Sequence, residues 1–283
     1  GIFKNYNVNN FDTAAHVSSY ICMLFVDKAS NIWAGLHQKG FIKLEPATGK
    51  VEHYNIISDT NTFYSNELKA IYNSVYAMSE GSDHIYWLAT HDGLYKFNSV
   101  SKEINPVRAK PLQRDQVRDD LFSVMLPDEN GFWLGSWAGG LSYYNIRTNQ
   151  WNIYKFDLRK TGVATTNIVS DIKYKSKNEL WITSNDKGFG IFNTITHDFH
   201  FFGGDNTKTN NIPGTLCYHL MEDSQGNIWL SFPIGLLKVR QNESKFNYTG
   251  VPVTRTDNGE FWAINCMLED KAGRWLDRKS TRL

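Results

Sequence analysis

Cysteine is scarce in this chain of 283 residues, which has only Cys22, Cys217 and Cys266. The number is odd, the three lie far apart, and none stands in a C-x-x-C pair. This pattern argues against a disulfide framework and against a cysteine-ligated zinc site. We therefore expect no structural metal, and no motif indicates a cofactor.

Long hydrophobic runs are missing as well. The longest, YICMLFV at 20–26, has seven residues, whereas a helix that spans a membrane needs about 18 or more. We expect any membrane attachment to depend on segments outside this sequence.

The chain also has no excess of charge of either sign. Lys and Arg together number 30, and Asp and Glu number 29, so nothing attracts the chain to nucleic acid in general. The G-x-S-x-G, H-E-x-x-H and phosphate-binding loop motifs of common enzyme classes are absent too. We expect no nucleic-acid partner and no catalysis by this chain.

What the sequence does have is an internal repeat centred on tryptophan. Six segments align on Trp33, Trp87, Trp133, Trp181, Trp229 and Trp275. The successive spacings are 54, 46, 48, 48 and 46 residues. A repeat of this period is typical of an array of similar supersecondary units.

Two further positions recur within each repeat. A small residue comes two places after the Trp, as Gly35, Ala89, Gly135, Thr183 and Ser231. Because side chains alternate along a strand, it shares the Trp face and leaves room there for a neighbouring sheet. Six or seven places after the Trp comes a glycine that suits a hairpin turn with positive φ, at Gly40, Gly93, Gly140, Gly188 and Gly235.

Each repeat contains four short segments with alternating apolar residues, which we name strands a to d, with the Trp on strand b. Four-stranded units of about 40 to 50 residues are typical of β-propeller blades. The sequence therefore predicts an all-β propeller of four-stranded antiparallel blades, with about six blades present from a seven-bladed or tandem propeller. In this arrangement each indole would fill the space between two blades.

The two ends of the chain depart from the repeat. FKNYN at 3–7 resembles VEHYN at 51–55, so we expect it to be the last strand of a preceding blade. After Trp275 both the small residue and the glycine are missing. We place the propeller at 1–276 and expect 277–283 to be a non-native tail.

The repeat resembles the two-component regulator propeller repeat. The motifs that carry the resemblance are clearest in MEDSQGNIWLSFPIGLLKV at 221–239, in LPDENGFWLGSWAGGLSYYN at 126–145, and in SNELKAIYNS at 65–74. Proteins of that family are mostly bacterial membrane sensors whose propellers lie in the periplasm and signal to a histidine kinase. The resemblance implies a periplasmic sensor region that detects oligosaccharides. It also implies a neighbouring propeller or β-sandwich domain as partner, and a homodimeric receptor.

Ligand contacts are expected on the blade face that carries the b–c turns and the d–a connections, because these loops vary while the framework repeats. Aromatic side chains could stack on sugar rings, and planar polar groups could bond the hydroxyls. The candidate platforms are Trp137, Phe232, Tyr64 and Phe261, and the candidate polar partners are His91, Asp92, Asn185, Asp186, Arg114 and Arg118. Trp137 is the strongest candidate, since a Trp in a hairpin turn has little packing role.

The acidic residues that recur between strands a and b have a simpler interpretation. Asp27, Asp128, Asp223 and Asp270 occupy equivalent positions, where a carboxylate can accept hydrogen bonds from nearby backbone N–H groups. Two other functions stay open at this point: a carbohydrate-active propeller enzyme, either a glycosidase or a lyase, and a scaffold whose loops dock another protein.

Overall fold

The computed structural model describes residues 20–58, 60–61, 63–108, 120–156, 167–202, 215–233 and 235–239, and the backbone of three strands at 246–249, 264–269 and 275–279. The chain divides into two compact units, residues 1–108 and residues 109–283. Each unit is described by itself.

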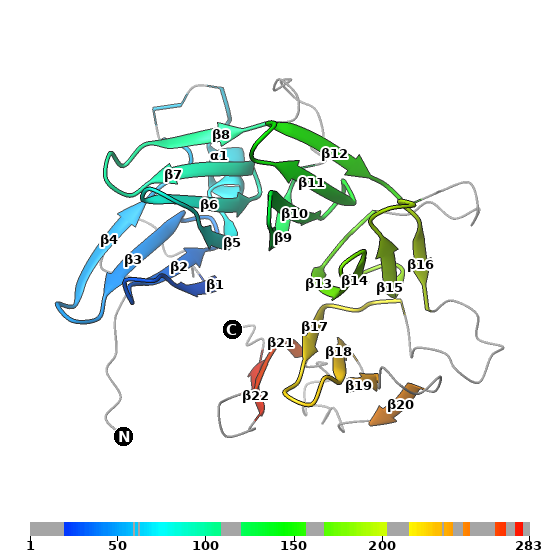
Figure 1. Ribbon diagram of the computed structural model, residues 1–283. Helices are drawn as coiled ribbons and strands as arrows, with labels where there is room; N and C mark the ends of the chain where they lie inside the picture. Colours follow the sequence, from blue (N-terminus) through cyan, green and yellow to red (C-terminus); the bar gives the residue numbers. More distant parts are fainter. Residues whose placement is uncertain are drawn as a thin grey trace. The chain divides into compact units, whose positions relative to one another are not determined.

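The first unit holds two four-stranded antiparallel sheets, shown in blue and cyan in Figure 1. Blade 1 consists of β1 (Ile21–Val26), β2 (Ile32–Leu36), β3 (Phe41–Glu45) and β4 (Lys50–Tyr54), and blade 2 consists of β5 (Val75–Glu80), β6 (Ile85–Thr90), β7 (Gly93–Asn98) and β8 (Ile104–Val107). In both sheets the strands pair in sequence order, as strands a to d of a propeller blade do.

The second unit holds three more blades of the same topology. Blade 3 consists of β9 (Phe122–Asp128), β10 (Gly131–Ser136), β11 (Leu141–Asn145) and β12 (Gln150–Tyr154), and blade 4 of β13 (Asp171–Ser176), β14 (Glu179–Ser184), β15 (Gly188–Asn193) and β16 (Phe199–Phe201). Blade 5 consists of β17 (His219–Glu222), β18 (Ile228–Phe232), β19 (Gly235–Val239) and β20 (Phe246–Thr249), and β21 (Ile264–Glu269) pairs with β22 (Trp275–Lys279) in a two-stranded sheet. The prediction of an all-β propeller built from four-stranded blades is confirmed.

One apolar segment of the repeat forms a helix. The apolar run that follows Ser65 begins as a helix, α1 (Asn66–Tyr72), and becomes a strand only at Val75. Ser65 caps the helix by accepting a hydrogen bond from the Leu68 N–H, and a cap of this kind favours helix over strand at that point. No helix among the described residues is long and apolar enough to span a membrane.

The repeated tryptophans lie on the second strand of each sheet, as predicted. Trp33, Trp87, Trp133 and Trp181 are at most 7% exposed. Trp229 is half-buried, with the Lys238 ammonium 5.0 Å from the ring centroid. The side chain of Trp275 is outside the described part of the chain.

The small residue two places after the Trp is required by the next blade. A Cβ on Gly35 would lie 2.2 Å from the carbonyl oxygen of Val75, the first residue of blade 2. A Cβ on Gly135 would lie 2.7 Å from a methyl carbon of Val169, just before blade 4. Contacts this short do not occur between real atoms, so a larger residue would force the two sheets apart.

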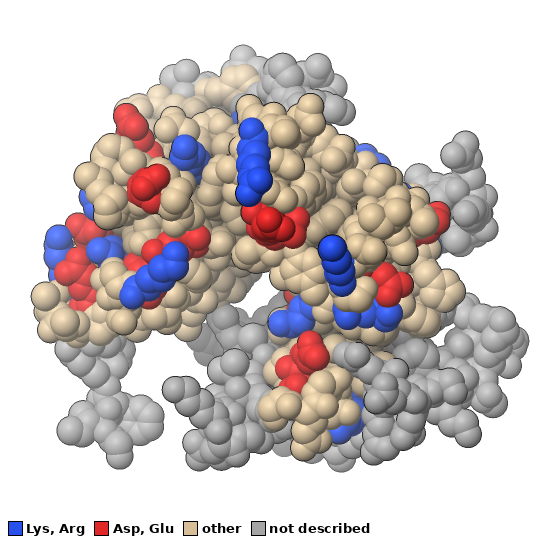
Figure 2. Space-filling model, in the orientation of Figure 1, with Lys and Arg blue, Asp and Glu red and all other residues tan. Residues whose placement is uncertain are grey.

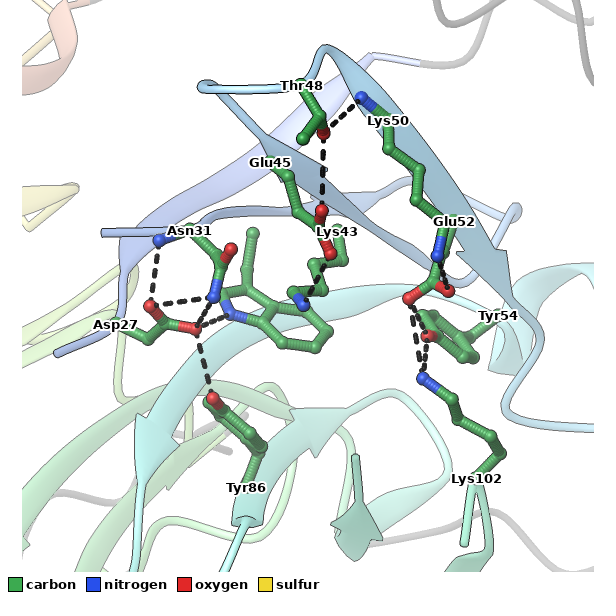
Figure 3. A network of polar contacts seen from close by, with 11 residues as sticks. Asp27, Asn31, Lys43, Glu45, Thr48, Lys50, Glu52, Tyr54, Tyr86 and Lys102 are labelled. Carbon is green, nitrogen blue, oxygen red and sulfur yellow. Dashed lines mark hydrogen bonds and ion pairs between the residues drawn. The ribbon is translucent and has the colours of Figure 1, made fainter. Parts of the chain in front are cut away.

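The turn between strands a and b is held by a carboxylate that also binds the indole (Figure 3). Asp27 accepts hydrogen bonds from the Trp33 Nε1–H at 2.8 Å, from the Asn31 backbone N–H at 2.8 Å, and from the Tyr86 hydroxyl of blade 2 at 3.0 Å. Asp223 binds Trp229 and the Asn227 backbone in the same way, each at 2.8 Å. Burial raises the pKa of both carboxyls, but these hydrogen bonds outweigh it, so each pKa lies below its ordinary value.

Blades 3 and 4 depart from this arrangement. Asp128 does not hold its turn as predicted but accepts hydrogen bonds from the hydroxyls of Tyr143 and Tyr174 at 2.7 and 3.0 Å. Blade 4 has Ser176, Lys177 and Asn178 in place of an acidic turn. The buried Trp181 Nε1–H accordingly has no hydrogen-bond partner among the described residues.

Asparagines join the b–c turns of blades 1 and 3 to the start of the next blade in the same unit. The Gly40 N–H donates to the Asn73 carbonyl at 2.5 Å, and the Gly140 N–H donates to the Asn167 carbonyl at 2.8 Å. The Asn73 side chain also accepts from the backbone N–H groups of Ile56 and Ile57, at 2.7 and 2.9 Å. The predicted positive φ is confirmed at all five glycines of the b–c turns, and it ranges from 70° at Gly40 to 142° at Gly235.

The missing carboxylate of blade 4 provides a natural control for the Asp–Trp hydrogen bond. Trp33→Phe removes an indole N–H that binds Asp27, whereas Trp181→Phe removes a buried N–H that binds nothing. We expect Trp33→Phe to lower the free energy of unfolding by about 1–3 kcal/mol more than Trp181→Phe does, because only the first leaves a carboxylate short of a donor. Urea unfolding followed by circular dichroism measures both. Equal losses would show that the hydrogen bond does not stabilise the blade.

Candidate functional site

The b–c turns of the blades sit in equivalent places. The N–H of the residue four after the Trp donates to the carbonyl of the residue that precedes strand a: His37 to Tyr20 at 3.0 Å, His91 to Ser74 at 3.2 Å and Trp137 to Leu121 at 3.0 Å. This position is occupied in blades 1 to 5 by His37, His91, Trp137, Asn185 and Pro233. The framework thus presents a different side chain at the same place on each blade.

Trp137 is the exposed aromatic side chain of this series. It is 47% exposed, whereas the framework Trp133 of the same blade is 7% exposed. Its turn is rigid, since the Ser136 Oγ accepts hydrogen bonds from the N–H groups of Ala138 and Gly139 at 3.3 and 2.5 Å. The indole is therefore a large apolar face held on a fixed backbone, as predicted for a platform.

Asn185 and Asp186 lie on the next turn in the second unit. The Ser170 hydroxyl donates to Asn185 Oδ1 at 2.7 Å, and the Ser184 hydroxyl donates to Asp186 Oδ1 at 2.6 Å. Both residues are half-buried. Their turn neighbours that of Trp137 because the Val169 N–H, just before Ser170, donates to the Ser136 carbonyl at 2.9 Å. We call Trp137, Ser170, Asn185 and Asp186 the Trp137 patch.

Asp92, predicted as a polar ligand contact, is instead a buried anchor of the first unit. It is 0% exposed, and Arg108 binds both its carboxylate, at 2.5 Å, and its carbonyl, at 2.8 Å. The hydroxyls of Tyr64 and Tyr95 also donate to this carboxylate, that of Tyr64 at 2.9 Å. Asp92 and Tyr64 thus bind each other, and the buried Asp92 has no exposed surface that could contact a ligand.

His91 lies in a cluster of rings shared by blades 1 and 2. It stacks on Tyr76 with 4.2 Å between ring centroids, and the Tyr76 hydroxyl lies 3.3 Å from His37 Nδ1. His37 stacks in turn on Tyr20, which is 51% exposed. Burial lowers the pKa of His91 to about 4 and also lowers that of His37. Both imidazoles are therefore neutral at neutral pH.

The placement of Phe232 corrects another expectation. It is the last residue of β18 and 1% exposed, in the core between blades 4 and 5. Phe232 lies on the same face of the strand as Ile228 and Leu230, which face that core. The turn therefore begins only at Pro233. Arg114, Arg118 and Phe261 lie outside the described residues.

Two residues that sequence reasoning did not select form an ion pair across the second unit. Asp171 and His219, each ten residues before its Trp, join β13 of blade 4 to β17 of blade 5 through His219 Nδ1. Burial lowers the pKa of His219, but the charge and hydrogen bond of Asp171 outweigh it and raise the pKa above its ordinary value. Met23 and Val124, which pair with the same position of strand b in blades 1 and 3, are apolar.

The groups of the Trp137 patch are able to bind a polar ligand. No group of three or more His, Cys, Asp or Glu side chains in the described ranges could hold a metal ion. Figure 2 shows acidic and basic side chains interspersed on the visible face, with no broad area of one sign. An exposed indole beside hydroxyl, amide and carboxylate groups suits an uncharged, hydroxyl-rich ligand.

No protein-family model and no curated protein matches the chain. Its fold is similar to two extracellular domains from B. thetaiotaomicron, each assigned to a hybrid two-component system. For BT3049 the identity is 15% and the TM-score 0.65, covering 93% of this chain and 35% of that one. For BT4673 the values are 14% and 0.67, covering 94% and 31%.

The chain thus spans about a third of the length of those two sensor structures. It is also similar to the WD40 β-propeller domain of Doa1, with 11% identity, a TM-score of 0.57, and coverage of 91% of this chain and 74% of that one. At these identities the likeness establishes the propeller fold alone.

The buried His91 gives the first unit a measurable pH dependence. Its pKa is about 4 when folded and about 6.5 when unfolded, so the unfolded chain binds the proton more tightly. The free energy of unfolding that depends on neutral His91 is complete above pH 6.5 and is lost as the pH falls toward 4. Relative to His91→Gln, the native protein should lose about 3 kcal/mol between pH 7 and 4.

Urea unfolding at several pH values measures this difference. His84→Asn at an exposed position is the matched control and should leave the pH dependence of the native protein unchanged. A constant difference between the native protein and His91→Gln would contradict the prediction.

Proposed function

We propose that this chain is a non-catalytic, ligand-sensing propeller of an extracytoplasmic receptor. Its ligand is an oligosaccharide, and its signal passes to a histidine kinase outside the chain. The resemblance of the repeat to the two-component regulator propeller and the likeness of the fold to two extracellular sensor domains support this class. The receptor region would lie in the periplasm.

The observation that carries the proposal is the exposure of Trp137. Burying an indole normally contributes to stability, so a Trp that is 47% exposed on its turn gains less from folding than the framework Trp133, which is 7% exposed. Sugar rings present C–H groups on their faces, and these pack on flat aromatic surfaces. Trp137 fits this use because its turn is fixed by Ser136 on one side and by the start of blade 4 on the other.

The rest of the Trp137 patch supplies the polar half of such a site. Asn185 has an amide that can both donate and accept, and Asp186 has a carboxylate that can accept from sugar hydroxyls. Ser170 and Ser184 already hold these two side chains in place. Fixed polar groups beside an apolar platform determine which hydroxyl arrangement binds.

Signalling requires that the bound state differ from the free state in the packing of blades. The Trp137 patch draws residues from blades 3 and 4, so a ligand that touches both would favour one arrangement of these two blades. A neighbouring propeller or β-sandwich domain of the same receptor, in a homodimer, would receive that change.

Substituting the platform tests the proposal. Trp137→Ala should weaken oligosaccharide binding about tenfold, since stacking and apolar burial on an indole contribute about 1.5 kcal/mol. The melting temperature should fall far less than for a buried Trp, because the Trp137 side chain is 47% exposed. Isothermal titration calorimetry against a panel of neutral oligosaccharides measures the affinity.

Trp133→Ala is the matched control in the same segment. It should lower the free energy of unfolding by about 3–5 kcal/mol, because a buried indole is lost. If no oligosaccharide binds the native protein, or if Trp137→Ala binds as well as the native protein, the proposal fails. Shortened sugar products in the calorimeter cell would indicate a glycosidase or lyase instead.

A further inference from the structure

The ion pair between Asp171 and His219 joins two blades at a position where blades 1 to 3 have apolar side chains. Asp171 of β13 and His219 of β17 each pair with the small residue two places after the Trp of their own blade. In blades 1 to 3 the residues that pair with this position are Met23, Ala77 and Val124. Among the described blades, titratable side chains therefore occupy this position in blades 4 and 5 alone.

The contact between the two strands is largely buried and holds the start of blade 5. Figure 1 shows β13 in green beside β17 in yellow. The Asp171 carboxylate binds His219 Nδ1 and also accepts a hydrogen bond from the Leu220 N–H at 3.0 Å. Asp171 is 7% exposed, and the His219 side chain is 27% exposed. A carboxylate at this depth is less well compensated when its partner is uncharged, so the contact weakens when the imidazole loses its proton.

One path connects this ion pair to the Trp137 patch through blade 4. Ser170 directly precedes Asp171 in the sequence, and its hydroxyl donates to Asn185 Oδ1 at 2.7 Å. The Ser170 N–H also donates to the Thr183 carbonyl at 2.9 Å, which ties Ser170 to the neighbouring strand. A shift of the Asp171 backbone would therefore move the hydroxyl that positions Asn185.

A second path reaches the same turn through blade 5. The Cys217 N–H, two residues before His219, donates to the Ser184 carbonyl at 3.0 Å. Ser184 is also the residue whose hydroxyl binds Asp186. The turn that carries Asn185 and Asp186 is thus bonded to both of the segments that the ion pair joins.

The groups around His219 determine the direction of its pH dependence. Burial lowers the pKa of His219, Asp171 raises it through its charge and hydrogen bond, and Lys173 of β13 lowers it, with the result above the ordinary value. Burial and the charge of Asp171 raise the pKa of the Cys217 thiol, so this neighbour keeps its proton while His219 titrates. Ser231, whose hydroxyl accepts from the His219 N–H at 3.0 Å, is uncharged.

Strand β21 also packs against β17, and its side chains are outside the described part of the chain. Since the pKa of His219 is raised on folding, the stabilisation by the imidazolium is complete below about pH 6.5 and is lost as the pH rises through the pKa of the folded state. The sign is opposite to that of His91 in the first unit, whose pKa is lowered.

We propose that the Asp171–His219 pair is a proton-dependent switch that controls the affinity of the Trp137 patch for its ligand. The imidazolium holds Asp171 in place, and the backbone contacts on both sides of the pair then fix the turn that carries Asn185. Loss of the proton loosens this turn, so the patch is less well ordered in advance and binds more weakly. Asp171 and His219 are positioning residues, and their role in binding rests on the proposed function.

A pH titration of the free protein tests the switch with the proton as the only probe. Nuclear magnetic resonance of ¹⁵N-labelled protein follows the imidazole of His219 and the side-chain amide of Asn185 from about pH 6 to about pH 9. Both should titrate with one midpoint, above about pH 6.5. In His219→Gln, which keeps a neutral donor for Asp171, the Asn185 signal should no longer depend on pH.

His200→Gln is the matched control, because His200 is exposed on β16 of the same blade. It should leave the titration of Asn185 unchanged. If His219→Gln does not fold, the double variant Asp171→Asn, His219→Gln removes both charges of the pair and takes its place.

Calorimetry gives a second readout, with the neutral oligosaccharide of the panel that binds the native protein most tightly. Its affinity should fall about fivefold as the pH rises over the same range, and it should stay constant in His219→Gln. Because the coupling is reciprocal, the native protein should also take up protons on binding. Titrations in two buffers of different ionisation enthalpy measure this uptake.

The two readouts separate this proposal from the proposed function. The switch is overturned if the Asn185 signal does not follow the titration of His219, or if it still titrates in His219→Gln. It is also overturned if the native protein binds the oligosaccharide with the same affinity at every pH. If no oligosaccharide binds, the proposed function fails, and the titration of Asn185 still decides whether the pair controls the turn.

Discussion

The packing of each Trp-bearing face against the next blade is the constraint on which the rest of this structure depends. The two sheets approach so closely that a single methyl group on Gly35 would collide with the Val75 carbonyl. That approach requires a small residue two places after the Trp. The Asp27 carboxylate then fixes the indole and reaches across to Tyr86 of the next blade, so one side chain aligns both the turn and the neighbour.

Because these framework residues hold the blades together, the sequences of the b–c turns are free to vary. Their backbone is already fixed, by glycines with positive φ and by asparagines such as Asn73 and Asn167 at the start of the next blade. The side chain four places after the Trp is therefore not needed to fix its turn, and it differs from blade to blade. A rigid scaffold with variable loops is the usual basis of a binding surface, and the exposed Trp137 illustrates it.

The framework was predictable from the sequence because its constraints are local and repeated. The Trp spacing predicts the blades, and the glycine position predicts the turns. The helix at 66–72 was missed because an apolar run suits a buried helix as well as a strand, and only the Ser65 cap separates them. Asp92 was misassigned because its partners Arg108 and Tyr64 come from distant loops. Phe232 could have been placed correctly from the sequence, because it follows Ile228 and Leu230 at the two-residue spacing of one strand face.

Two exposed apolar side chains in this protein therefore have different meanings, and the repeat distinguishes them. Leu24 of blade 1 is 67% exposed, whereas its equivalents in the strand pairing, Met78, Ile172 and Leu220, follow another blade in their own unit and are buried. The equivalents of Trp137 are His37, His91, Asn185 and Pro233, which are all half-buried and mostly polar. The exposure of Trp137 is a property of its own turn, and a partner for it must come from outside the packing of blades.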